Sequence, residues 1–99
     1  MFGKLQEAQK QLEEIKKRLD HVLVDAEAGG NAVKVTVSAS KIIRDIEISE
    51  DLMAEGDREA IQDLIVVALN RALNEAEKVS ATEMQTAARN IMPGFPGLG

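Results

Sequence analysis

The sequence predicts an α+β fold in which a three-stranded antiparallel meander lies between two helices. Residues 21–48 contain short segments in which apolar and polar side chains alternate, which is typical of half-buried strands. The segments on either side instead repeat apolar residues every three or four positions, as amphipathic helices do. A three-stranded sheet is stable only when its apolar face is covered, so the helices are expected to cover it.

The first predicted element is a helix over residues 3–19. Its apolar residues form one narrow stripe of the coiled-coil type: Leu5, Ala8, Leu12, Ile15 and Leu19. Glutamine, glutamate and lysine, which are good helix formers, fill the other positions. Lys10 and Lys17 point away from the stripe, where a solvated lysine is the ordinary interpretation and contact with a phosphate is the alternative.

Three strands are predicted next. The alternation is clear in two segments, residues 21–28 and residues 32–38. Gly29, Gly30 and Asn31 lie between them and tolerate positive φ angles, which predicts a short hairpin turn. After a softer break, residues 41–48 predict a third strand. Three of its residues are expected to share one face: Ile42, Ile46 and Ile48.

A connection over residues 49–56 leads to a long second helix, predicted from Asp57, a suitable N-cap, to about Arg89. Its first half is apolar on nearly all sides, and one three-stranded sheet cannot bury such a helix. A second copy of the chain is therefore expected to cover the remaining face, which predicts an intertwined homodimer. The predicted dimer interface contains Ile65, Val66, Val67 and Leu69.

The second half of this helix is expected to project beyond the sheet. The helix spans about 50 Å at 1.5 Å per residue, whereas strands of seven or eight residues span roughly 25 Å. The overhang emerges where the first helix joins the sheet, so the apolar stripe of that helix can pack antiparallel on it. Each chain then carries a protruding two-helix arm, with Lys4 and Arg89 towards its tip.

Residues 1–90 are expected to form a single domain. Residues 91–99 contain two prolines and three glycines, so they cannot continue the helix and are expected to form a flexible tail. The alternative is that Phe95 or Met92 docks on an apolar surface.

The composition excludes several classes of function. The chain has no cysteine, which excludes disulfides and cysteine-based metal or redox chemistry. It has one histidine, His21, and no glycine-rich phosphate loop, so we expect no enzyme, no cofactor and no small-molecule substrate. The acidic residues of 49–56 lack the spacing of a calcium-binding loop, so no metal site is expected. No apolar stretch of about 18 residues and no signal peptide is present, which predicts a cytoplasmic protein without a membrane partner.

The charge is unevenly distributed along the chain. A formal net charge of -5 argues mildly against nucleic acid as a partner, because domains that bind phosphates are usually basic. Residues 1–19, however, carry five basic and three acidic side chains, whereas residues 20–56 carry three and eight. The acidic charge is therefore concentrated in the predicted sheet, which weakens that argument.

Several short motifs occur together and in order along nearly the whole chain. They are Met1–Gln9, Gly30–Val37, Ile46–Ile48, Ala68–Ala72 and Pro93–Phe95. In combination they resemble the YbaB/EbfC family of small bacterial nucleoid-associated proteins. The resemblance implies a helix, three strands and a helix, assembled as a homodimer whose paired helices protrude like tweezers and bind duplex DNA in the nucleoid.

The leading hypothesis is therefore a homodimer that binds duplex DNA with little or modest sequence specificity and helps organise DNA or modulate gene expression. Phosphate contacts position a protein without reading the bases. The candidate phosphate-binding residues are Lys4, Lys10, Lys17, Lys78, Arg89 and Arg71. The alternative is a protein-interaction module whose arms grip a partner protein, which the negative charge and the flexible apolar side chains near Met84 favour.

Overall fold

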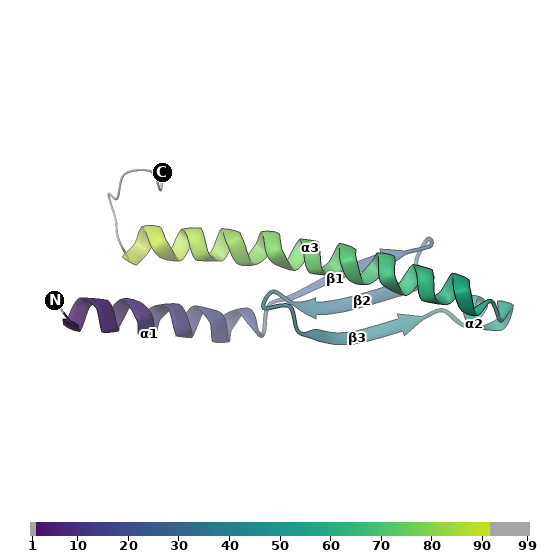
Figure 1. Cartoon of the computed structure of the whole chain (residues 1–99), viewed down its shortest axis with the longest axis horizontal. Helices are drawn as coiled ribbons and strands as arrows, with labels where there is room; N and C mark the ends of the chain where they lie inside the picture. Colours follow the sequence, from purple (N-terminus) through teal and green to yellow (C-terminus); the bar gives the residue numbers. More distant parts are fainter. Residues whose placement is uncertain (1, 92–99) are drawn as a thin grey trace.

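The computed structural model describes residues 2–91, in which a sheet is flanked by helices in the predicted order (Figure 1). The elements are α1 (Phe2–Leu19), β1 (Leu23–Ala28), β2 (Val33–Ser38), β3 (Ile43–Ile48), α2 (Glu50–Glu55) and α3 (Arg58–Ile91). The strands form one antiparallel sheet in the order β1-β2-β3. The predicted α+β fold is thereby confirmed. Residues 92–99 of the predicted tail lie outside the described residues.

The molecule is elongated, with extents of 62 × 23 × 15 Å and a radius of gyration of 18.4 Å. A compact domain of this length has a radius of gyration of about 13 Å. The difference arises because α3 has 34 residues while each strand has six. Figure 1 shows the C-terminal half of α3 beyond the sheet, with α1 running antiparallel beside it. The predicted two-helix arm is therefore present in the single chain.

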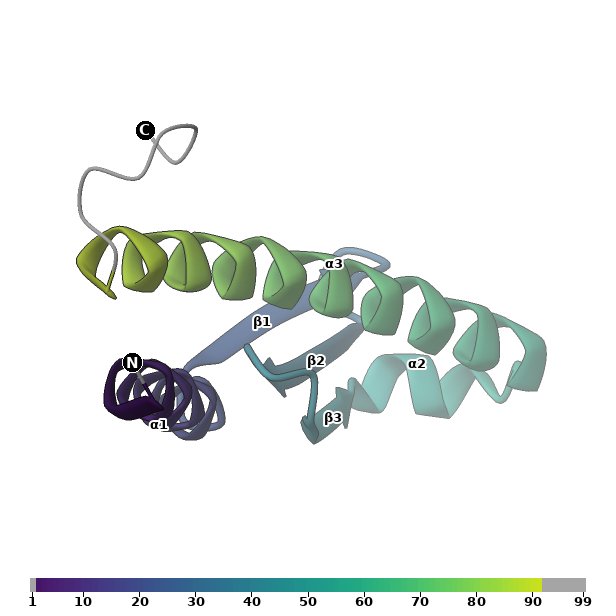
Figure 2. The same ribbon diagram turned by 60° about the vertical axis from the view of Figure 1, so that its left-hand side comes forward.

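The core lies between α3 and the first two strands. Figure 2 shows α3 crossing one face of the sheet over β1 and β2. Small and β-branched residues dominate this contact and are completely buried: Val33, Val35, Val37, Ala68, Ala72 and Ala76. Because the three alanines recur every fourth residue, they form one side of α3 and let its backbone approach the sheet closely.

The turn between β1 and β2 follows the sequence prediction. Gly29, Gly30 and Asn31 all have positive φ angles, of 67°, 63° and 72°. Glycine adopts this conformation at little cost, and asparagine tolerates it better than most residues. The turn sets the register in which Ala28 pairs with Val33.

The strand β3 differs from the prediction in one respect. The pairing of β3 with β2 is irregular at one position: Thr36 pairs with Asp45 and Val37 with Ile43, so no residue of β2 lies opposite Arg44. The expectation that Ile42 shares a face with Ile46 and Ile48 is therefore wrong. The residues opposite the three buried valines of β2 are Ile43, Ile46 and Ile48. A bulge of this kind adds one residue to one strand and shifts the alternation of its side chains.

The connection predicted over residues 49–56 contains the short helix α2. Its N-cap is Ser49, whose hydroxyl accepts a hydrogen bond of 3.1 Å from the backbone N–H of Leu52. It ends at Gly56, which has a φ angle of 70°. Six residues are too few for a helical period to be recognised in the sequence. The predicted N-cap of the long helix is confirmed, since Asp57 accepts a 3.1 Å hydrogen bond from Ala60 N–H.

Candidate nucleic-acid interface

The outer side of α1 presents two of the predicted lysines. Lys10 and Lys17 are seven residues apart, so at 100° per residue they lie on nearly the same side of the helix, opposite its apolar stripe. Both side chains are exposed, as is that of Lys4, which lies about 120° around the helix from Lys10. Within the described residues none of the three forms an ion pair. Phosphate oxygens can therefore approach these side chains without displacing a carboxylate.

Two further candidates lie on the C-terminal half of α3. Lys78 is exposed and lies 3.9 Å from a carboxylate oxygen of Glu75, one helical turn before it. Arg89 is exposed in the last turn of α3, where a positive charge also interacts favourably with the helix dipole. Both residues belong to the arm, because they lie on the C-terminal half of α3.

The sixth candidate, Arg71, has a structural contact. Its Nη1 donates a hydrogen bond of 2.8 Å to the backbone carbonyl of Glu27 at the end of β1. This bond joins the middle of α3 to the outer strand of the sheet. The guanidinium of Arg71 is therefore already engaged, unlike the ammonium groups of Lys10 and Lys17.

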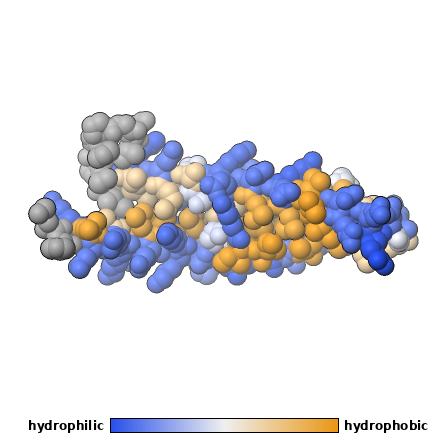
Figure 3. Space-filling model, in the orientation of Figure 1, coloured by the Kyte–Doolittle hydropathy of each residue, from blue (hydrophilic) through white to orange (hydrophobic). Residues whose placement is uncertain are grey.

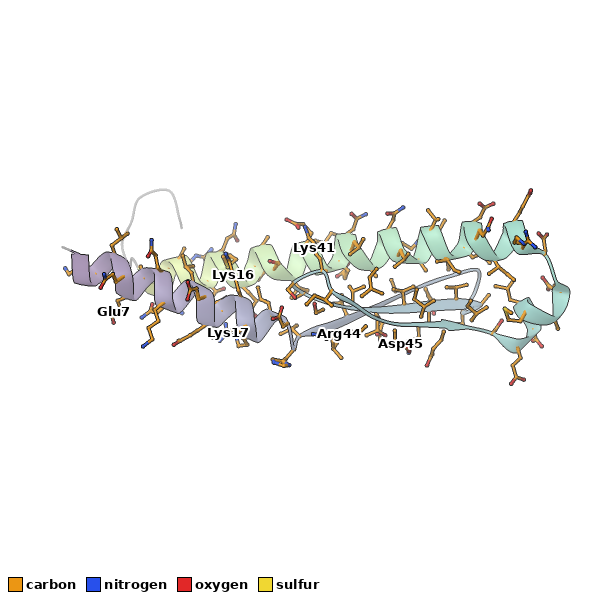
Figure 4. All side chains as sticks on the ribbon, turned by 60° about the horizontal axis from the view of Figure 1, so that its bottom comes forward. Glu7, Lys16, Lys17, Lys41, Arg44 and Asp45 are labelled. Carbon is orange, nitrogen blue, oxygen red and sulfur yellow. The ribbon has the colours of Figure 1, made fainter. Side chains whose placement is uncertain are left out.

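The structure also gathers three basic residues that were not among the candidates from the sequence, Lys16, Lys41 and Arg44, beside Lys17, which was. Figure 4 shows Lys16, Lys17, Lys41 and Arg44 where α1 meets the sheet, whereas Glu7 lies farther out along α1. Lys16 belongs to a basic run at the end of α1, which is a weak signal because helices often carry such runs on their solvent side. Lys41 and Arg44 are isolated in the sequence, so only the fold brings them to this place.

Lys16, Lys17 and Lys41 border a pocket of about 480 Å³ between α1, the β2–β3 turn and α3, which we call the junction pocket. It is lined by Lys16, Lys17, Leu19, Asp20, Ala39, Ser40, Lys41, Glu77, Ser80 and Met84. One ion pair, between Lys41 and Glu77, joins the β2–β3 turn to α3 across the pocket, and a second, between Arg18 and Glu83 at 3.0 Å, joins α1 to α3 outside its lining. Both pairs are exposed, so each contributes little to stability.

A second surface is apolar and lies over β3 and the adjoining side of α3. In Figure 3 it forms a continuous hydrophobic area in the middle of the molecule. The helix α3 packs on β1 and β2, so it leaves Ile43 and Ile46 of β3 exposed to 49% and 40%. On α3, Val66 is exposed to 55%, and Ile65 and Leu69 are only partly buried. We call these five residues the apolar face.

The fourth residue of the predicted dimer interface occupies a different position. Val67 is also exposed, but it lies 100° around α3 from Val66 and only about 40° from Arg71, which contacts β1. It therefore lies on the flank of α3 that faces away from β3. The structure brings together three of the four predicted interface residues and adds Ile43 and Ile46 to them.

Residues 2–91 contain neither a metal-binding cluster nor a membrane-spanning helix. No group of three or more histidine, aspartate or glutamate side chains in this part of the chain is arranged to hold a metal ion. Among the helices of residues 2–91, none combines the length and the hydropathy that a membrane span requires.

The chain is similar over nearly its whole length to a known protein family and to several of its members. The family model of the YbaB/EbfC DNA-binding family matches residues 1–91. A nucleoid-associated protein of Flavobacterium johnsoniae is 39% identical over 98 residues, which cover 99% of this chain and 91% of the relative. Another, from Clostridium acetobutylicum, is 40% identical over 98 residues, which cover 99% of this chain and 86% of the relative.

The fold recurs in a solved structure. The crystal structure of an uncharacterized protein from Helicobacter pylori superimposes with a TM-score of 0.72 at 22% identity, covering 91% of this chain and 90% of the other. The family and the names of the relatives describe a DNA-binding protein of the nucleoid and not an enzyme. On the evidence of its sequence, its αβββα fold and its nearly complete match, this chain belongs to the YbaB/EbfC DNA-binding family.

Proposed function

We propose that this protein is a homodimer of the cytoplasm that binds the backbone of duplex DNA in the nucleoid, with little or modest sequence specificity. The observation that carries the proposal is the family match over residues 1–91. The structure supports it with an exposed two-helix arm that carries lysines and with an apolar face suited to a second copy.

The proposal of a homodimer depends on the apolar face. Ile43 and Val66 are branched aliphatic side chains that remain exposed in an isolated chain. Burying them would stabilise the protein by roughly 25 cal/mol for each Å² of apolar surface removed from water. The face combines one strand and one helix of the same chain, so a two-fold related copy can bury both at once. A second chain would also supplement a core that is small for a 99-residue protein with so long a helix.

The proposal of DNA binding depends on the arm. Lys10 and Lys17 form a line on the outer side of α1, with Lys4 nearer the tip, and Lys78 and Arg89 lie on the neighbouring part of α3. Lysine ammonium groups contact phosphates as point charges and do not form the paired hydrogen bonds that identify a base. Contacts of this kind position a protein on DNA but read no sequence, which is why we propose modest specificity.

The decisive experiment is fluorescence-anisotropy binding of a labelled duplex of about 30 base pairs over a series of salt concentrations. We expect the logarithm of the affinity to fall linearly with the logarithm of the salt concentration, by about 0.9 for each phosphate neutralised. Light scattering of the same sample should give the mass of a dimer. A well-folded dimer that binds no duplex even at low salt would overturn the proposal and turn attention to protein partners.

Variants assign the binding to the arm. Changing Lys10 and Lys17 together to alanine should weaken binding about tenfold or more near 0.1 M salt and lower the salt slope by roughly 2. A matched control removes the same charge elsewhere, through Lys34→Ala and Arg58→Ala. Adding Arg89→Ala to the arm variant should weaken binding further. Equal losses in the arm and control variants would show that only overall charge matters.

A further inference from the structure

We propose that Lys16 and Lys41 form a phosphate-binding site at the base of the arm, which holds a backbone phosphate of the DNA duplex. This inference rests on the proposed function, since it assigns a specific contact of the same ligand. It adds to the arm a site where α1, the β2–β3 turn and α3 meet. Of the two lysines on the outer side of α1, Lys17 also lines this pocket, whereas Lys10 does not.

The geometry of the junction pocket suits a phosphate. Lys16 comes from the last turn of α1 and Lys41 from the turn before β3, and both line the same pocket of about 480 Å³ (Figure 4). The hydroxyls of Ser40 and Ser80 line it as well. Two ammonium groups and two hydroxyls are all hydrogen-bond donors to phosphate oxygens, and the ammonium groups also supply charge.

The charges around the pocket favour an anion. Its acidic side chains are Asp20 and Glu77, and Glu77 is already paired with Lys41. Lys16 forms no ion pair with any described residue. Arg44 adds a positive charge beside Asp20, because its Nη2 donates a hydrogen bond of 3.0 Å to the backbone carbonyl of that residue. Basic groups therefore outnumber acidic ones here, although the whole chain carries a formal net charge of -5.

The backbone of Lys41 provides a second, independent observation. Its φ angle is 72°, in the left-handed region that glycine occupies easily and lysine does not. The turn is closed by a hydrogen bond of 2.8 Å from Lys41 N–H to the carbonyl of Ser38. A lysine at this position keeps an ammonium group at the pocket at a conformational cost that glycine would avoid. Such strain is commonly found where a side chain has a function.

The first test compares two variants with equal charge. The pocket variant carries Lys16→Gln and Lys41→Gln, and the control carries Lys34→Gln and Arg58→Gln. Duplex binding is measured by anisotropy across a salt series. We expect the pocket variant to bind about fivefold or more weakly near 0.1 M salt, with a salt slope lower by roughly 1 to 2, and the control to retain the slope of the wild-type protein.

The second test separates binding from stability. Replacing Lys41 by glycine relieves the backbone strain but removes the ammonium group, so Lys41→Gly should unfold at a higher denaturant concentration yet bind DNA more weakly. Replacing Glu77 by glutamine removes the carboxylate that competes for Lys41, so Glu77→Gln should bind more tightly. If Lys41 had only a structural role, Lys41→Gly and Glu77→Gln would both be less stable than the wild-type protein. The salt slope of DNA binding would then be unchanged in both variants.

The outcomes distinguish this inference from the proposed function. If the wild-type dimer binds no duplex, the proposed function fails and this site fails with it. If the wild-type protein binds but the pocket variant keeps its affinity and slope, only the site is overturned. If the pocket variant becomes a monomer by light scattering, the two lysines belong to the contact between copies and the site is likewise overturned.

Discussion

Arg71, in the middle of α3, donates a hydrogen bond of 2.8 Å to the backbone carbonyl of Glu27 at the end of β1. The strand β1 is at the edge of the sheet, so within residues 2–91 no further strand pairs with its outer side. The bond therefore satisfies an edge carbonyl and connects the helix to the strand. Arg71 therefore has a structural role. The sequence alone indicated only a candidate phosphate contact at this position.

The first prediction follows from this contact. Arg71→Ala should lower the free energy of unfolding by about 1 kcal/mol, the ordinary contribution of a side-chain hydrogen bond to the backbone. Denaturation with urea measures the change, and Arg58→Ala is the control because it removes the same charge from the same helix. Unchanged stability together with a lower salt slope for DNA binding would instead identify Arg71 as a phosphate contact.

The second prediction concerns the β1–β2 turn. A Cβ atom on Gly29 would lie 2.9 Å from Cδ1 of Leu64, whereas one on Gly30 would meet nothing within 4 Å. Both glycines have positive φ angles, so alanine costs about 1 kcal/mol at either position. At Gly29 the displaced side chain of Leu64 should add about 1 kcal/mol or more. Urea denaturation of Gly29→Ala and Gly30→Ala measures the difference, and equal losses would mean that Leu64 moves aside without cost.

The third prediction tests the apolar face. Ile46→Asp should give a monomer, because a partner that covers this face would bury an unpaired carboxylate at a cost of several kcal/mol. Ile46 is partly exposed in the single chain, so the aspartate can remain hydrated there. Leu23→Asp is the control, since Leu23 is exposed to 57% on the opposite face of the sheet.

Light scattering and circular dichroism decide this prediction. We expect Ile46→Asp to have half the mass of the wild-type protein and to retain its helical signal, while Leu23→Asp remains a dimer. A dimer of Ile46→Asp at the same protein concentration would show that another surface joins the copies.

Local patterns were sufficient to predict most of the elements. The alternation around residues 32–38 indicates a strand, and positive-φ residues such as Gly29 mark the turn before it, because both depend on interactions between near neighbours. The two-helix arm was also predictable, since a helix of 34 residues is longer than any six-residue strand that it can cover.

Other features depended on contacts between distant parts of the chain. The irregularity at Arg44 changes which isoleucines share a face, and α2 is too short to produce a recognisable period. Three residues of the predicted interface belong to the apolar face, but Val67 does not, because the face includes only the flank of α3 that lies beside β3. No spacing in the sequence indicates how α3 is rotated on the sheet.

The candidate site also combines features that follow from local sequence patterns with features that depend on contacts between distant residues. The amino-acid order alone shows that α1 is basic and that Lys10 and Lys17 share its outer side, because helical geometry relates positions along one element. That Lys16 and Lys41 line one pocket, and that Arg71 contacts Glu27, follows only from the folded chain. Those pairs come from different elements, and their distances depend on how α3 and α1 pack against the sheet, which is set by the fit of alanines and valines in the core.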